Sequence, residues 1–125
     1  MSIHGTFYFT KTKSGNLLGE FINNGLKNFI VESANIDEGF CKEKFEAEYV
    51  TNWLEDEKTF VAKLIIVRNL ENTKMFNLIW YDLKSNKPIF SGIGFKKKKI
   101  LIGKYSDQEN NERPTAVWSN WGFWA

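Results

Sequence analysis

The chain contains almost none of the residues that most often build reactive centres. Its 125 residues include one cysteine, Cys41, and one histidine, His4. A single cysteine excludes an intrachain disulfide, and one residue of each kind is too few for a structural zinc site, which takes four such ligands. Ser-His or Cys-His catalysis would depend on His4, which lies near a chain end where segments fray. We therefore expect no metal, no cofactor and no nucleophilic catalytic residue.

Long apolar runs and arginine are also scarce. No run approaches the roughly 18 apolar residues of a transmembrane helix, and the N-terminus lacks the basic and apolar regions of a signal peptide. We expect a soluble, cytoplasmic protein without a membrane span; a secreted chain whose signal has been removed is the alternative. The chain has 2 Arg against 15 Lys. Because arginine recognises phosphates and base edges more specifically than lysine, we expect no specific nucleic-acid partner.

What the chain has in excess is aromatic side chains. It contains 11 Phe, 5 Trp and 4 Tyr, which is 16% of the residues. Aromatic residues favour the half-buried surface of a pleated sheet, and the scarcity of alanine argues against a helical bundle. The length fits one domain, residues 1–125, with a core of its own.

Alternation of apolar and polar residues predicts eight or nine short strands joined by short turns. The expected strands are 6–12, 17–23, 26–34, 44–53, 59–69, 74–83, 89–95, 100–105 and 115–125. Between the second and third, Asn24-Gly25 predicts a type I′ turn with positive φ angles. Residues 42–54 are open to two interpretations. Charges at alternate positions favour a strand, whereas Phe45, Tyr49 and Trp53 recur every four residues, as in a helix.

The hairpin 89–105 indicates how these strands are arranged. Gly92 and Gly94 fall on one face of its first strand, Gly103 lies in the second, and a lysine turn, 96–99, joins them. Glycines on one face of a strand mark a sharp bend or a close approach of another backbone. We interpret the hairpin as a corner of an all-β, antiparallel up-and-down barrel of about eight strands, rather than of a sandwich. Pairing of the N-terminal strand with the C-terminal strand, the Trp-rich 115–125, would close it.

Two segments carry a resemblance to a known group of barrels. G-T-F-Y at Gly5–Tyr8 and the S-G-I-G-F and I-L-I-G-K-Y strands of the corner hairpin resemble small calycin-type barrels, the lipocalin, fatty-acid-binding and avidin group. The chain departs from the lipocalin G-x-W motif, because Phe7 stands in the place of the tryptophan, and Arg113 is only a candidate for the arginine that packs over it. The resemblance implies a barrel with one small-molecule cavity and assigns no functional residue.

An excess of aromatic residues without a reactive constellation predicts a non-enzymatic barrel that binds a partly apolar or aromatic small molecule in its interior. The expected ligand-binding residues are Trp80, Tyr81, Tyr105 and Trp118.

Two other functions remain open. In the first, Trp121 and Trp124 of the C-terminal strand anchor a protein partner or a second copy of the chain, which leaves homo-oligomerisation open. In the second, the barrel is an enzyme of the cyclase or isomerase type in which an inward carboxylate has a raised pKa. The candidate carboxylates are Glu20, Glu46, Glu48 and Asp82. A polar side chain that faces an open cavity would distinguish the enzyme from a simple binder.

Overall fold

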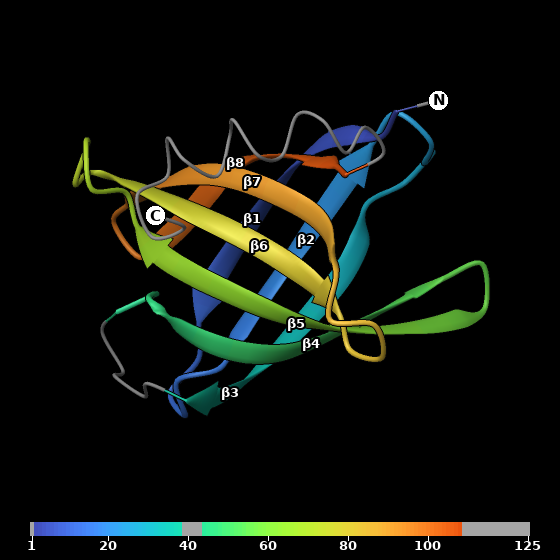
Figure 1. Cartoon of the computed structure of the whole chain (residues 1–125), viewed down its shortest axis with the longest axis horizontal. Helices are drawn as coiled ribbons and strands as arrows, with labels where there is room; N and C mark the ends of the chain where they lie inside the picture. Colours follow the sequence, from blue (N-terminus) through green and yellow to red (C-terminus); the bar gives the residue numbers. More distant parts are fainter. Residues whose placement is uncertain (1, 39–43, 109–125) are drawn as a thin grey trace.

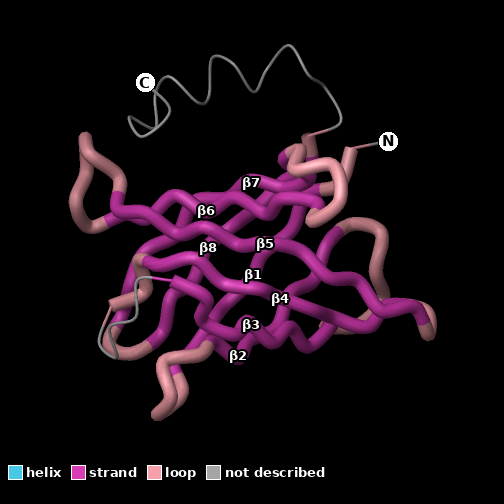
Figure 2. Tube along the Cα trace, turned by 60° about the horizontal axis from the view of Figure 1, so that its bottom comes forward, coloured by secondary structure: helices cyan, strands magenta, loops and turns pink. Residues whose placement is uncertain are grey.

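A computed structural model of the chain describes residues 2–38 and 44–108, which form eight antiparallel strands closed into a barrel (Figure 1). The strands are β1 His4–Lys11, β2 Leu17–Asn23, β3 Ile30–Glu38, β4 Ala47–Glu55, β5 Lys58–Arg68, β6 Met75–Asp82, β7 Pro88–Lys97 and β8 Ile100–Asp107. Each strand pairs with the next along the chain, and β8 pairs with β1. The tube view shows strands and loops throughout the described part, with no helix, and so no helix that could cross a membrane (Figure 2).

The predicted fold class is confirmed, but the closing strand is not the predicted one. Both edges of β1 are occupied, one by β2 and the other by β8. The last described strand, Ile100–Asp107, therefore closes the barrel. Residues 115–125, which we expected in that position, lie outside the described part of the chain.

The ambiguous segment 42–54 is a strand from Ala47 onward, and described residues 44–46 before it form neither helix nor strand, so the helical alternative is wrong. β4 pairs with β3 on one side and with β5 on the other. Its alternate residues Tyr49, Thr51 and Trp53 are buried. A strand in this position pairs with both β3 and β5. A helix in its place would leave the facing edges of β3 and β5 without hydrogen-bond partners.

The predicted type I′ turn at Asn24-Gly25 is also wrong. Neither residue has a positive φ; among the described residues, consecutive positive φ angles occur at Asp56 (51°) and Glu57 (65°), between β4 and β5. In the loop after β2, the backbone amide of Gly25 donates a hydrogen bond to Oδ1 of Asn23 at 2.8 Å. A loop follows, and β3 begins at Ile30 rather than at residue 26.

The glycine corner is confirmed. Gly94 of β7 lies opposite Gly103 of β8. A Cβ atom at Gly103 would lie 2.2 Å from the carbonyl oxygen of Ile93 and 2.6 Å from Cα of Gly94, so only glycine fits. This close backbone approach supports the tight coiling of a small barrel. The predicted lysine turn joins the two strands, with Lys98 at a φ of 57°.

Inward side chains fill one end of the barrel. This packed end is made by fully buried residues, chiefly aliphatic, from six strands. They include Phe9, Leu17, Tyr49, Leu64, Ile66, Leu78 and Leu101. The other end is not filled by its side chains, and the candidate site lies there.

Candidate functional site

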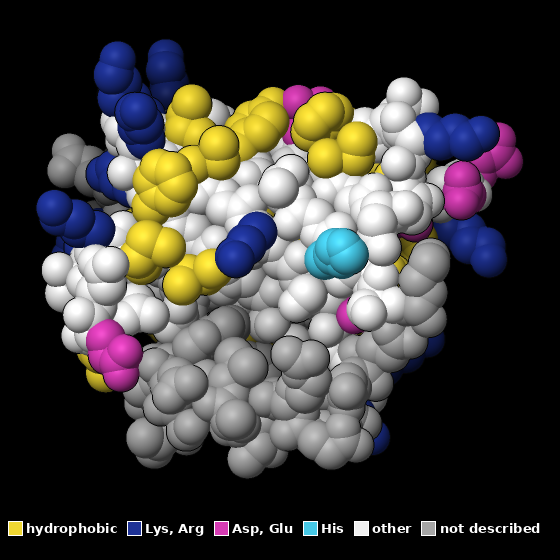
Figure 3. All heavy atoms as spheres, turned by 90° about the horizontal axis from the view of Figure 1, so that it is seen from above, with side chains coloured by type: hydrophobic (Ala, Val, Ile, Leu, Met, Phe, Trp, Pro, Cys, Tyr) yellow, Lys and Arg dark blue, Asp and Glu magenta, His cyan; other side chains and the backbone are white. Residues whose placement is uncertain are grey.

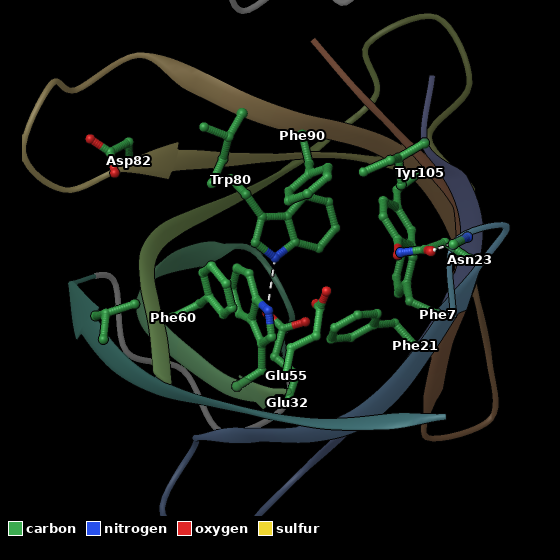
Figure 4. Close-up of a pocket in the computed structure, with 15 residues that line it drawn as sticks. Phe7, Phe21, Asn23, Glu32, Glu55, Phe60, Trp80, Asp82, Phe90 and Tyr105 are labelled. Atoms are coloured by element: carbon green, nitrogen blue, oxygen red, sulfur yellow. Dashed lines mark hydrogen bonds between the residues drawn. The ribbon is translucent and has the colours of Figure 1, made fainter. Parts of the chain in front are cut away.

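A cavity of about 510 Å³ occupies the unfilled end of the barrel (Figure 4). Small-molecule sites commonly measure roughly 300–1,000 Å³. The lining residues come from all eight strands, from the β2–β3 loop and from Ile3, which precedes β1. They are Ile3, Phe7, Phe21, Asn23, Gly25, Glu32, Trp53, Glu55, Phe60, Val61, Trp80, Asp82, Ile89, Phe90 and Tyr105. Inward alternation on eight neighbouring strands brings these distant residues together.

Seven of the fifteen lining residues are aromatic, and their rings contact one another. The indole of Trp80 meets the ring of Phe7 edge-on, with centroids 5.8 Å apart, and that of Phe90 at 6.5 Å. On the opposite side, Trp53 stacks on Phe60 with centroids 5.6 Å apart and planes inclined by 12°. Such contacts stabilise ring positions beyond simple burial, so the walls are formed before any ligand arrives.

Glu32 places a buried carboxyl group among these rings. Its side chain is only 3% exposed. Oε2 accepts hydrogen bonds from Oγ1 of Thr51 at 2.5 Å and from Nε1 of Trp80 at 2.9 Å. Oε1 receives no hydrogen bond from any residue within 2–38 and 44–108. Burial raises the pKa of Glu32 to about 7, although both hydrogen bonds act in the opposite direction.

Two more acidic side chains line the cavity, and their surroundings differ. Glu55 forms neither a hydrogen bond nor an ion pair with a described residue. Asp82 lies at the rim, away from the ring cluster (Figure 4), where Oδ2 accepts a hydrogen bond from the amide of Ser85 at 2.8 Å. That bond is the main cause of the lowered pKa of Asp82. Asp82 therefore stabilises the β6–β7 turn, whereas the Glu55 carboxylate is available to a ligand.

Tyr105 supplies a neutral hydroxyl group on the β8 side. Nδ2 of Asn23 donates to its oxygen at 2.8 Å. Burial, and to a lesser degree the charges of Glu32 and Glu55, raise the pKa of Tyr105 to about 12. The phenol therefore stays protonated near neutral pH and can act as a hydrogen-bond donor or acceptor, but not as a base.

The structure brings together two of the four residues that we expected to bind a ligand. Trp80 and Tyr105 both line the cavity. Tyr81 follows Trp80 directly in β6, so strand alternation directs its side chain to the outer face, and it does not line the cavity. Trp118 lies outside the described residues, as do Trp121, Trp124 and Cys41. Binding by any of these residues stays a prediction.

Of the four candidate carboxylates, Glu20 and Glu48 lie on the outer face of their strands, whereas Glu46 is partly buried, with an Oε1 that has no hydrogen-bond partner among the described residues. Glu48 forms an ion pair with Lys63 at 3.0 Å, and Glu46 does so with Arg68 at 3.1 Å. Glu20 accepts a hydrogen bond from the Tyr8 hydroxyl. Only the fourth, Asp82, lines the cavity.

The sequence interpretation missed Glu32, the most deeply buried carboxyl group of the cavity. The signal was present, because Ile30, Glu32 and Ala34 alternate along the third expected strand. Two apolar neighbours at spacing two place Glu32 on the inner face. Among the described residues, no group of three His, Cys, Asp or Glu side chains could hold a metal ion.

The outer surface carries an apolar region next to a basic turn. Figure 3 shows hydrophobic side chains gathered on one face, with lysine or arginine side chains beside them. The exposed apolar residues of the described chain include Leu18 of β2, Phe95 of β7, and Ile100 and Ile102 of β8. Phe95 and Ile102 lie directly opposite each other on paired strands.

Comparison of the chain with protein-family models, with curated proteins and with solved structures found no match. The closed eight-stranded antiparallel barrel is compatible with the calycin resemblance.

Proposed function

We propose that this chain is a calycin-like binding barrel that holds a partly apolar or aromatic small molecule in the cavity at its unfilled end. The observation that carries this proposal is the cavity of about 510 Å³, whose wall is mostly apolar, with seven aromatic residues among the fifteen that line it. Small-molecule sites have this composition, because apolar walls supply affinity and a few polar groups orient the ligand. Preformed walls also lower the entropy cost of binding.

A titration with the neutral dye Nile red, followed by its fluorescence, tests the proposal. Phe90 and Phe95 form a matched pair, because both lie in β7 but only Phe90 lines the cavity. We expect Phe90→Ala to weaken dye binding about tenfold, since it removes a ring from the wall. Phe95→Ala should leave the affinity unchanged. Absence of binding, or equal effects of the two substitutions, would refute an interior site.

The alternative function, a barrel enzyme of the cyclase or isomerase type, is favoured by one observation. Oε1 of Glu32 borders the cavity without a partner among the described residues, while Oε2 is held by Thr51 and Trp80. A positioned carboxylate in apolar surroundings can take a proton from a bound substrate and return it elsewhere.

Elimination of 5-nitrobenzisoxazole tests for such a base. In this reaction the carboxylate takes the proton on carbon 3, the N–O bond breaks, and the product is a coloured cyanophenolate. If Glu32 acts as a base, the wild-type protein should accelerate the reaction. The rate with Glu32→Gln should be about a hundredfold lower than the rate with the wild type. The outer-face variant Glu48→Gln is the control. A wild-type rate equal to that of Glu32→Gln would exclude this role.

A further inference from the structure

Among the described residues, the charged groups of the cavity lining all have the same sign. Glu32, Glu55 and Asp82 line the cavity, and no lysine, arginine or histidine within 2–38 and 44–108 does. The basic residues of the described chain lie outside the cavity lining. Lys11 stands over the ring of Tyr49, 5.3 Å from its centroid, in the packed end of the barrel. The lining is therefore acidic although the whole chain has a formal net charge of +2.

Strand register places Glu32 and Glu55 close enough to share one ligand group. Glu32 of β3 lies directly opposite Trp53 of β4. Glu55 follows Trp53 by two residues on the same face of β4, so it is the diagonal neighbour of Glu32. Diagonal neighbours on one face of a sheet have Cβ atoms within about 7–8 Å, within reach of long side chains. Figure 4 shows both glutamates on the same side of the cavity, across from Trp80 and Phe90.

No cationic group of the described chain neutralises this pair. Lys58 lies opposite Glu55 in the β4–β5 hairpin, yet it forms no ion pair with it and does not line the cavity. Two neighbouring carboxylates in apolar surroundings repel each other and are poorly solvated. A cation placed between them would relieve both costs. The aromatic rings around them add to this preference, because ring faces attract cations.

We propose that the cavity binds an organic cation, whose ammonium group lies between Glu32 and Glu55 and whose apolar part contacts the aromatic wall. This inference rests on the proposed function of the cavity as a ligand site. It deepens that function, because it excludes fatty acids and other anions as preferred ligands. A carboxylate ligand would meet like charges and no basic side chain among the described residues of the lining.

Three probes of one shape separate charge from hydrophobicity: 2-phenylethylamine, n-propylbenzene and 3-phenylpropionate. Calorimetric titration of the full chain at pH 8 should give the amine an affinity about tenfold higher than that of the neutral hydrocarbon. The anion should bind most weakly. A neutral or anionic probe that binds as tightly as the amine would overturn the inference. Nile red would still bind in that case, so the proposed cavity function would stand.

Charge-removing substitutions test the two glutamates. Glu55→Gln and Glu32→Gln keep the shape of each side chain, and each should reduce the preference for the amine over the hydrocarbon several-fold. Glu48→Gln is the matched control, because Glu48 lies on the outer face of the same strand as Glu55. Thermal unfolding of each variant verifies folding. If Glu55→Gln and Glu48→Gln had the same preference as the wild type, Glu55 would not contact the cation and the proposed position would be wrong.

Discussion

Trp80 and Glu32 are joined across the interior of the barrel by a hydrogen bond of 2.9 Å from Nε1 to Oε2. The two residues lie 48 positions apart in sequence, on β6 and β3, which do not pair with each other. Backbone hydrogen bonds therefore do not connect these strands, and the side chains do. The bond also orients the indole in the cavity wall and helps to keep a carboxyl group in an apolar interior.

Replacement of Trp80 by Phe should destabilise the protein more at high pH than at low pH. At pH 5 the Glu32 carboxyl group is mostly protonated, so the stability that the variant loses comes mainly from the missing packing contacts of the indole. At pH 8 the ionised carboxylate has lost a donor, which adds about 1–2 kcal/mol to the loss. Urea unfolding at the two pH values measures the difference. Trp53→Phe is the control, because the Trp53 indole also lines the cavity but donates no hydrogen bond to Glu32; its loss should be the same at both pH values.

Glu32 should make folding less favourable as the pH rises. The pKa of Glu32 is about 7 in the folded chain, against 4.5 for the same side chain exposed to water. The folded state therefore binds the proton more tightly than the unfolded state. The stability that this proton binding contributes is fully present below pH 4.5 and is lost as the pH rises through 7. Between pH 4 and pH 8, Glu32→Gln should gain about 3 kcal/mol of stability relative to the wild type. A stability difference that is constant across this range would contradict the burial of an ionisable group.

The affinity for an organic cation should increase with pH. Besides Glu32, the titratable groups of the lining within residues 2–38 and 44–108 are Glu55, Asp82 and Tyr105, and the Tyr105 phenol stays neutral. Alkylammonium probes keep their charge to about pH 10, so the change between pH 6 and pH 8 comes from ionisation of Glu32. We expect the Kd of 2-phenylethylamine to be up to about tenfold higher at pH 6 than at pH 8. In Glu32→Gln the Kd should be independent of pH over this interval, and a surviving pH dependence would assign the effect to another group.

Gly103→Ala should disrupt the corner between β7 and β8. Its new methyl group would lie 2.2 Å from the carbonyl oxygen of Ile93 and 2.6 Å from Cα of Gly94. Both of these neighbours are backbone atoms, so rotation of a side chain cannot relieve the contacts. We expect a loss of about 3 kcal/mol or more in chemical unfolding. Gly25→Ala is the control, because its nearest neighbour would be Oδ1 of Asn23 at 3.4 Å and its φ is not positive. Equal stability of the two variants would contradict the close approach.

The strand pattern could be obtained from sequence because it is a local property. Alternation of apolar and polar residues reports which face of a strand is buried, whatever its partner is. It was sufficient even at β4, where Tyr49 and Trp53 also fit helical spacing. Turn type was less accessible. Asn24-Gly25 has the composition of a type I′ turn, but the hydrogen bond from the Gly25 amide to Asn23 Oδ1 favours another conformation.

The sequence alone determined an all-β chain, its antiparallel order and its glycine corner, because alternation and glycine spacing depend only on neighbours along the chain. The tertiary structure decided which strand closes the barrel and which end stays unfilled. It also decided that Glu32, whose inward direction follows from strand alternation, lies at the unfilled end rather than in the packed end. Those outcomes depend on how the residues of eight strands fill a common interior, and the volume left over is a sum over side chains that lie far apart in sequence.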